Sequence, residues 1–136
     1  GGEISAHHYF RDFFFCDSGM IPWLLVCSMM SQTEQSLSSL VGAQVSAFPS
    51  SGEHNFIVND TKKMIEFISN YYKRGQASID TTDGVSISMK NWRMNLRASN
   101  TEPLLRLNIE AIANKLLVLE KLKEVTHLIK INLDKV

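Results

Sequence analysis

The chain has 136 residues, 44% of them hydrophobic, so it is long enough for one modest domain or for one small domain with a piece of another. Its 14 basic side chains balance 14 acidic ones. Nucleic acids and membrane surfaces attract proteins with a broad positive field, so this balance argues against both as partners. A local anion site, which needs only a few donors, is compatible with it.

The first residues, GGEISAHHYFRDFFF, resemble the end of a strand that enters a loop, and they include no initiator methionine. We therefore expect a piece of a longer protein, with the aromatic side chains of this segment in a core. The apolar run MIPWLLVCSMM is about half as long as a bilayer span, and no charged segment with a cleavage site precedes it. Cys16 and Cys27 are expected to be buried free thiols in a reducing compartment, and the protein to be cytoplasmic.

Two helices are predicted next. The first begins at Asp17 or Ser18, either of which can cap its first turn, and continues through Met30. Its surface is apolar on nearly all sides, so other protein has to cover it. The second is short and begins at Ser36, with an apolar face that includes Leu40.

The segment VSAFPSSGEHN breaks the helical pattern, because proline, serine and glycine favour turns and linkers. We place a domain boundary here. The prediction is a helical unit at residues 1–45, a hinge linker at 46–52 and a compact unit at 53–136.

Within residues 53–136, HNFIV predicts a short strand, and Asp60 is placed to cap a helix that continues to about Arg74. Gly75 is expected to end this helix as a C′ glycine does. In the segment ASIDTTDGVSISMK, Asp83-Gly84 supplies the positive φ of a hairpin turn between two alternating runs.

Two further strands are predicted in WRMNLR and LLRLNIEA, where apolar and polar residues alternate. The apolar residues that we expect to point inward are Trp92, Met94, Leu96, Leu105, Leu107, Ile109 and Ala111. A final helix is predicted from about Asn114 to Ile131. The order βαββββα predicts an α+β fold, with an antiparallel sheet of four to five strands and two helices on one face.

The stretch LRASNTEPLLRL gathers a polar cluster between these last two strands. Three interpretations are open. Ser99 and Glu102 fit a helix capping box, although Pro103 and the following period of two disfavour it. The cluster is otherwise an ordinary polar loop, or it is an anion site in which Arg97 offers a planar fork and short side chains offer donors, namely Ser99, Asn100 and Thr101.

On residue pattern alone, neither the histidines near the N-terminus nor two further arginines are predicted to form a functional site. His7 and His8 lie near Asp12, Cys16 and Asp17, but the spacing matches neither a helical histidine pair nor a paired-cysteine motif, so no metal site is predicted. Arg93 and Arg106 are charged strand positions, and we expect them to be solvated.

The segment RASNTEPLLRLNIEA closely resembles the phosphate-binding loop in the last domain of the phosphohexomutases, which has an Arg-x-Ser-Asn-Thr-x-Pro pattern before a strand ending in Glu-Ala. Independently, GGEISAHHYFRDF resembles the sugar-recognition loop of the third domain, Gly-Glu-x-Ser-x-His. The segments DSGMIPWLLV and FPSSGE are similar to the bacterial phosphomannomutase branch. The resemblance covers nearly the whole chain.

This resemblance implies an isomerase of carbohydrate metabolism, an intramolecular phosphotransferase that interconverts mannose 6-phosphate and mannose 1-phosphate. It implies that residues 1–45 are the C-terminal remnant of the third α/β domain. Residues 53–136 would be a C-terminal domain similar to the TATA-box-binding protein. It also implies Mg²⁺ and a bisphosphorylated sugar as activator and intermediate. The phosphoserine and metal loops would lie in upstream domains, so this chain alone is expected to be inactive.

The same resemblance assigns roles to residues, which we state as expectations. Sugar hydroxyls would be bound by Glu3, Ser5 and His7, and His7 would have an auxiliary catalytic role near the reacting hydroxyl. The non-reacting phosphate of the hexose phosphate would be held by Arg97, Ser99, Asn100 and Thr101. The alternatives are a phosphoglucomutase or phosphoglucosamine mutase of the same family, or a stand-alone phosphosugar-binding module.

Overall fold

The computed structural model describes residues 1–2, 6–99 and 101–133. The chain divides into two compact units, Gly1–Ala43 and Gln44–Val136. In the described part of the chain, no helix has the length and apolar character that a bilayer crossing requires.

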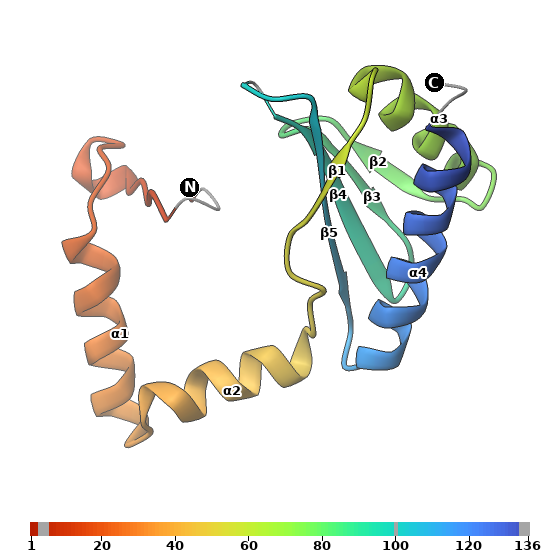
Figure 1. Cartoon of the computed structure of the whole chain (residues 1–136). Coiled ribbons are helices and arrows are strands. Elements are labelled where there is room, and N and C mark those ends of the chain that lie inside the picture. The colour runs from red at the N-terminus through yellow and green to blue at the C-terminus, as the bar shows by residue number, and fades with distance from the viewer. Residues whose placement is uncertain (3–5, 100, 134–136) are drawn as a thin grey trace. The chain divides into compact units, whose positions relative to one another are not determined.

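The first unit is helical (Figure 1). Its elements are a short 3-10 helix, η1 (Arg11–Phe13), the helix α1 (Met20–Thr33) and most of α2 (Leu37–Ala47), which continues into the second unit. Both predicted helices are confirmed. Serine side chains accept hydrogen bonds from the first turn of each helix: Ser18 Oγ, one residue before the N-cap Gly19, accepts from Ile21 N at 3.3 Å, and Ser36 Oγ accepts from Ser39 N at 3.2 Å.

The expected burial of the two thiols and of the aromatic segment is wrong. Cys16 and Cys27 are free thiols but both are exposed, and Phe14 and Phe15 are 88% and 70% exposed. Helix α1 has no buried residue either, and Trp23 on it is 60% exposed, which agrees with the expectation that other protein has to cover this helix. The physical reason is the lack of a second layer, because the described residues of this unit form no strand on which an apolar helix could pack.

The second unit is a five-stranded antiparallel sheet with strand order β1-β5-β4-β3-β2. The predicted order βαββββα and the α+β fold class are confirmed. In chain order its elements are β1 (His54–Ile57), α3 (Thr61–Lys73), β2 (Ser78–Asp80), β3 (Val85–Ser88), β4 (Trp92–Ala98), β5 (Leu104–Ala111) and α4 (Lys115–Asn132).

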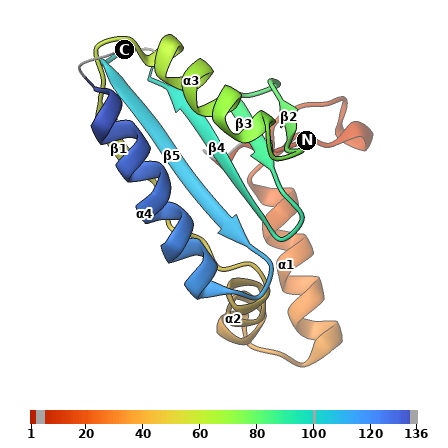
Figure 2. The same ribbon diagram turned by 90° about the vertical axis from the view of Figure 1, so that its right-hand side faces the viewer.

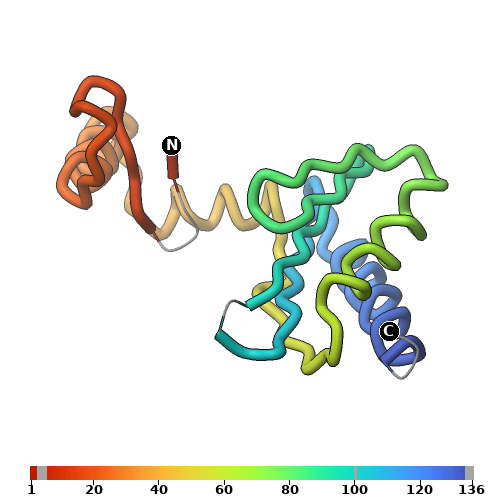
Figure 3. Tube along the Cα trace, turned by 90° about the horizontal axis from the view of Figure 1, so that it is seen from above, coloured from red at the N-terminus to blue at the C-terminus, as the bar shows by residue number. Residues whose placement is uncertain are grey.

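Helices α3 and α4 cover the same face of this sheet, as predicted (Figure 2). Every second residue of β4 and β5 points to these helices, and the inward residues expected from the sequence are all buried: Trp92, Met94, Leu96, Leu105, Leu107, Ile109 and Ala111. The polar residues between them lie on the opposite face of the sheet, which we call the open face. The loop joining β4 to β5 lies at the end of the sheet where the chain also passes from β1 to α3 (Figure 3). There Val58 N donates to Pro103 O at 3.2 Å.

The turns follow the sequence only in part. Asp60 caps α3 by accepting from Lys63 N at 3.0 Å, and Gly84 has a φ of 64°, both as expected. Gly75 donates its N–H to Tyr72 O and closes the helix end, but the left-handed residue is Gln76, with a φ of 65°. The chain therefore places its positive φ one residue later than a C′ glycine would.

The segment expected to be a hinge, residues 46–52, is attached to β5. Ala111 N donates to Pro49 O at 3.1 Å, Ser51 N donates to Ile109 O at 2.8 Å, and Ile109 N donates to Ser51 Oγ at 3.0 Å. Since β1 pairs with the first half of β5, these bonds cover the remainder of its edge. The linker thus extends the sheet.

One polar contact joins the two helices of this unit. Tyr72 on α3 donates to Glu124 Oε1 at 2.7 Å, and Lys121 donates to Glu124 Oε2 at 2.7 Å. Burial by itself would raise the pKa of Glu124, but the hydrogen bonds from Lys121 and Tyr72 outweigh it and lower that pKa below the ordinary 4.5. The carboxylate therefore stabilises the fold in its ionised form.

We expect Glu124→Gln to lower the free energy of unfolding by about 1 kcal/mol at neutral pH, because a charged hydrogen bond is lost. A carboxylate with a lowered folded pKa contributes stability above its unfolded pKa and loses it as the pH falls through the folded value. The difference from the wild type should therefore shrink as the pH falls through the folded pKa of Glu124, as measured by urea denaturation. Glu120→Gln is the control, since Glu120 is 68% exposed and lies 3.4 Å from Lys121 Nζ. A loss for Glu124→Gln that does not change with pH would contradict this account.

Candidate functional site

The polar loop between β4 and β5 borders a hollow of about 570 Å³ at the end of the sheet. Three of the residues predicted to bind a phosphate lie on its wall: Arg97, Ser99 and Thr101. The β2–β3 turn contributes Asp83 and Gly84, and β5 contributes Arg106. The structure therefore brings the described members of the predicted anion site together in one concave place.

Short hydrogen bonds fix the shape of the loop. Ser99 N donates to Leu104 O at 2.8 Å, and Leu104 N donates to Glu102 O at 2.7 Å. The hydroxyls of Ser99 and Thr101 are 3.4 Å apart, a long contact that a better acceptor could replace. The capping-box interpretation is wrong, because the loop leads directly into the strand β5.

Arg97 is held only loosely. Its Nη1 lies 3.4 Å from Asp83 Oδ2, and the side chain of Asp83 is 73% exposed. An ion pair of this length with an exposed partner contributes little free energy. With its own side chain 37% exposed at the wall of the hollow, Arg97 can exchange this partner for an incoming anion.

Gly84 allows the β2–β3 turn to pack against β4 beside Arg97. A Cβ on Gly84 would lie 2.5 Å from the carbonyl oxygen of Leu96, closer than real contacts allow. Asn95 Nδ2 fastens the same turn by donating to Asp83 O at 2.9 Å and to Ser86 Oγ at 3.1 Å. The lack of a side chain at position 84 therefore shapes one wall of the site.

Arg106 is the site residue that the sequence analysis missed. It was expected to be solvated, but its side chain is only 34% exposed and lines the hollow. Strand alternation places Arg106 on the same polar face as Arg97, and the register of β4 and β5 shows that the two lie directly opposite each other.

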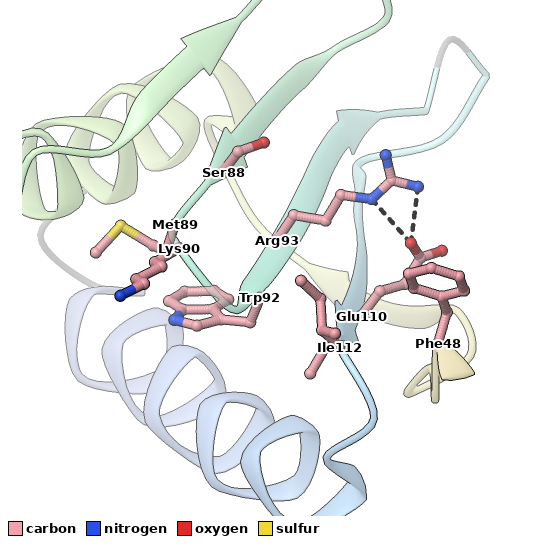
Figure 4. A pocket seen from close by; sticks show the side chains of 9 residues that line it. Phe48, Ser88, Met89, Lys90, Trp92, Arg93, Glu110 and Ile112 are labelled. Atoms are coloured by element: carbon pink, nitrogen blue, oxygen red, sulfur yellow. Dashed lines mark hydrogen bonds and ion pairs between the residues drawn. The ribbon is translucent and has the colours of Figure 1, made fainter. Parts of the chain in front are cut away.

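A second hollow, of about 500 Å³, lies near the opposite end of β4 (Figure 4). Its wall is mostly apolar and includes Phe48, Trp92 and Ile112. Arg93 also lines it, but Glu110 neutralises the guanidinium with contacts of 2.8 Å from Nε and 2.7 Å from Nη2. This paired arginine makes the second hollow a poorer anion site than the first.

The sugar-binding residues expected in the first unit are described only in part. Glu3 and Ser5 lie outside the described residues, as does Asn100 of the phosphate loop. His7 Nδ1 lies 2.7 Å from Asp17 Oδ2, and His8 N donates to Asp17 Oδ1 at 2.9 Å. The hydrogen bond with His7, followed by the one from His8 N, lowers the pKa of Asp17, so a carboxylate orients the His7 ring.

No cluster of three histidine, cysteine, aspartate or glutamate residues that could hold a metal ion occurs among the residues that the structure describes. The donor set of the first hollow, with arginines and hydroxyls, suits an anion instead.

Comparison with known proteins matches both units. Residues 1–48 match the model of the phosphoglucomutase/phosphomannomutase alpha/beta/alpha domain III, and residues 53–125 match that of the phosphoglucomutase/phosphomannomutase C-terminal domain. Over 96% of the chain, it is 52% identical to a phosphomannomutase of Escherichia coli and 50% identical to one of Vibrio cholerae serotype O1. It is 48% identical to a protein of Xanthomonas campestris named phosphohexose mutases.

These relatives are much longer. The matched part covers 28% of the Escherichia coli and Vibrio cholerae proteins and 29% of the Xanthomonas campestris protein. The chain thus spans less than a third of the length of the proteins it is similar to.

Proposed function

Since the chain belongs to the phosphoglucomutase/phosphomannomutase family, we propose that it is the C-terminal part of a phosphomannomutase that interconverts mannose 6-phosphate and mannose 1-phosphate. The observation that carries the proposal is the hollow at the end of the sheet, which Arg97, Ser99 and Thr101 line together. Relatives named phosphomannomutase, similar over nearly the whole chain, support the choice of mannose.

The phosphate-binding loop holds the phosphate of the sugar that is not reacting. Arg97 offers a fork of two N–H donors to phosphate oxygens, and Ser99, Asn100 and Thr101 add short donors. In the first unit, Glu3 and Ser5 bind sugar hydroxyls. Binding the far end of the substrate in this way turns remote binding energy into orientation at the reaction centre.

His7 has the auxiliary catalytic role, near the hydroxyl that accepts or releases the phosphoryl group. The contact between its Nδ1 and Asp17 Oδ2 orients the ring. A histidine oriented by a carboxylate is suited to moving a proton at that hydroxyl.

We propose that residues 1–45 are the end of the third domain of the mutase, 46–52 the linker and 53–136 the C-terminal domain, which closes over bound sugar phosphate and excludes water. Because residues 47–51 are hydrogen-bonded to β5 and to Ala113, which follows it, the linker moves with the C-terminal domain. The pivot then lies on the N-terminal side of Ala47.

The remaining catalytic parts belong to upstream domains of the same polypeptide. Mg²⁺, whose ligands are outside this chain, supplies positive charge for phosphoryl transfer when bound there. A bisphosphorylated sugar serves as activator and intermediate. The proposed location is the cytoplasm, a compartment in which free thiols such as Cys16 and Cys27 persist.

A substrate panel tests this proposal. The complete polypeptide should convert mannose 1-phosphate with a higher kcat/KM than glucose 1-phosphate or glucosamine 1-phosphate, while the chain of residues 1–136 alone should show no mutase activity. A clear preference for glucose 1-phosphate or glucosamine 1-phosphate would replace mannose with that sugar. Activity of the isolated chain would overturn the assignment of roles, and a natural reading frame ending at this length would favour the stand-alone module.

A further inference from the structure

The hollow beside the phosphate loop contains a negative charge of the protein's own. Among the described residues that line it, Asp83 carries the acidic side chain. Its Oδ2 lies 3.4 Å from Nη1 of Arg97, the guanidinium that is proposed to bind phosphate. A carboxylate at this place occupies a donor that the phosphate needs and repels the incoming anion. An acidic residue in an anion site therefore calls for an explanation.

The main chain of Asp83 is held firmly, but its carboxylate is held weakly. Asn95 Nδ2 donates to Asp83 O at 2.9 Å, and the neighbouring Gly84 packs closely against β4. The side chain of Asp83 is 73% exposed, and its contact with Arg97 is long, so breaking this contact costs little free energy. A tethered group of this kind stays at a high effective concentration beside its partner, because it leaves and returns without diffusing away.

The carboxylate also has a purpose when no ligand is bound. Arg97 lies directly opposite Arg106 in the register of β4 and β5, and like charges in such a pair destabilise a sheet. A negative charge beside Arg97 offsets this repulsion in the empty site. A phosphate monoester carries close to two negative charges, so it is a stronger partner for the guanidinium than a single carboxylate and can displace it.

We infer that Asp83 is a resident counter-ion of Arg97, which the phosphate displaces on binding and which returns as the phosphate leaves. Asp83 thus limits the affinity for phosphate and shortens the lifetime of the complex.

This inference rests on the proposed function, which gives a short lifetime its value. The phosphate that does not react in the first transfer of a bisphosphorylated intermediate is the one that reacts in the second. The loop therefore has to release one end of the sugar and bind the other within each turnover. A carboxylate that recaptures Arg97 assists this release, because it stabilises the guanidinium as the phosphate moves away.

The first test is a titration of the chain with inorganic phosphate, followed through the amide resonances of the β4–β5 loop at constant pH and ionic strength. Asp83→Asn keeps the size of the side chain and removes its charge. It should bind phosphate about two- to fivefold more tightly, the range expected when an exposed ion pair no longer competes. The gain should appear mainly as a slower dissociation of phosphate, measured from the line shapes.

Asp80→Asn is the matched control, since it removes the same charge from the same hairpin. Asp80 Oδ1 accepts from Thr82 N at 3.0 Å, and Asp80 is not among the described residues that line the hollow. This variant should change the phosphate affinity by less than about 1.5-fold, because an exposed charge outside the site is screened by salt. An equal gain in Asp80→Asn and Asp83→Asn would reduce the effect to net charge and overturn the inference.

A double-mutant cycle shows whether Asp83 acts through Arg97. In an Arg97→Gln background, Asp83→Asn should change the affinity by less than about 1.5-fold, because the carboxylate no longer has a guanidinium to occupy. The same gain with and without Arg97 would mean that Asp83 only repels the anion, which would overturn the exchange. Asp83→Ser provides the measurement if the asparagine variant does not fold, and the same increase in affinity is expected of it.

The outcomes keep this inference apart from the proposed function. Unchanged phosphate affinity in Asp83→Asn would overturn the role of Asp83 and leave the phosphate loop intact. Weaker binding by this variant would also overturn it, since Asp83 would then hold Arg97 in its binding position. The absence of any phosphate-dependent change in the loop of the wild-type chain would instead overturn the phosphate site itself.

Discussion

Under the proposed function, replacing Arg97 by alanine in the complete polypeptide is expected to lower kcat/KM for mannose 1-phosphate by roughly 10- to 100-fold. A lost charge-assisted hydrogen bond costs about 1.5–3 kcal/mol, and each 1.4 kcal/mol is a factor of about ten. The substitution should cost little folding free energy, because the ion pair that Arg97 forms with the exposed Asp83 is a long contact of 3.4 Å. The folded state should therefore keep its stability while the enzyme loses phosphate affinity.

The kinetic constants identify the kind of loss. KM should rise, since the phosphate is bound before the reaction. The size of any fall in kcat should measure how much the phosphate contact orients the sugar for reaction. Arg93→Ala is the control, with a guanidinium on the same strand that Glu110 neutralises. An unchanged kcat/KM in Arg97→Ala would count against a phosphate role for the whole loop.

The sheet could be predicted from the sequence because one of its faces is buried. Where helices cover one face of a sheet, burial makes apolar and polar residues alternate along each strand. This alternation continues through β4 from Trp92 to Leu96 and through β5 from Leu105 to Ala111. The polar loop interrupts this period at Ser99, so its position between the strands was also predictable. Its interpretation as a phosphate site needed the family resemblance, since polar loops of this composition are common.

Arg106 could not be identified from strand pattern alone. Period two assigns it to the polar face, where most arginines are solvated, and only the register of the hairpin shows that it lies opposite Arg97. The predicted burial of Cys16 and Cys27 was wrong for a different reason. An apolar run predicts that a helix needs to be covered, but it does not show which protein segment covers it.

The second large predicted effect is a loss of stability when Gly84 is replaced. Comparing three glycines of the second unit separates the cost of a left-handed backbone from the cost of a steric clash. Gly84→Ala should lower the free energy of unfolding by about 3 kcal/mol, from a left-handed backbone and from overpacking. The φ of Gly84 is +64°, and an added Cβ would lie 2.5 Å from Leu96 O and 3.1 Å from Arg97 Cβ. Either the turn or the strand β4 has to move.

Gly52 and Gly75 are the matched controls, measured by urea denaturation in the same chain. Gly52 has a φ of +72°, and no described atom lies within 4 Å of the position that an added Cβ would take, so Gly52→Ala isolates the backbone cost, about 1 kcal/mol. A Cβ on Gly75 would meet Tyr72 O at 3.4 Å, an ordinary contact, so Gly75→Ala should change stability by less than about 0.5 kcal/mol.

The same series connects the turn to the binding site. The methyl group of Gly84→Ala presses on the backbone and Cβ of Arg97, so this variant should also weaken phosphate binding, whereas Gly52→Ala should not. Equal losses of stability at positions 84 and 52 would show that the close approach to Leu96 carries no cost. Full phosphate affinity in a folded Gly84→Ala variant would show that the guanidinium of Arg97 adapts to a displaced strand, and that the turn does not position it.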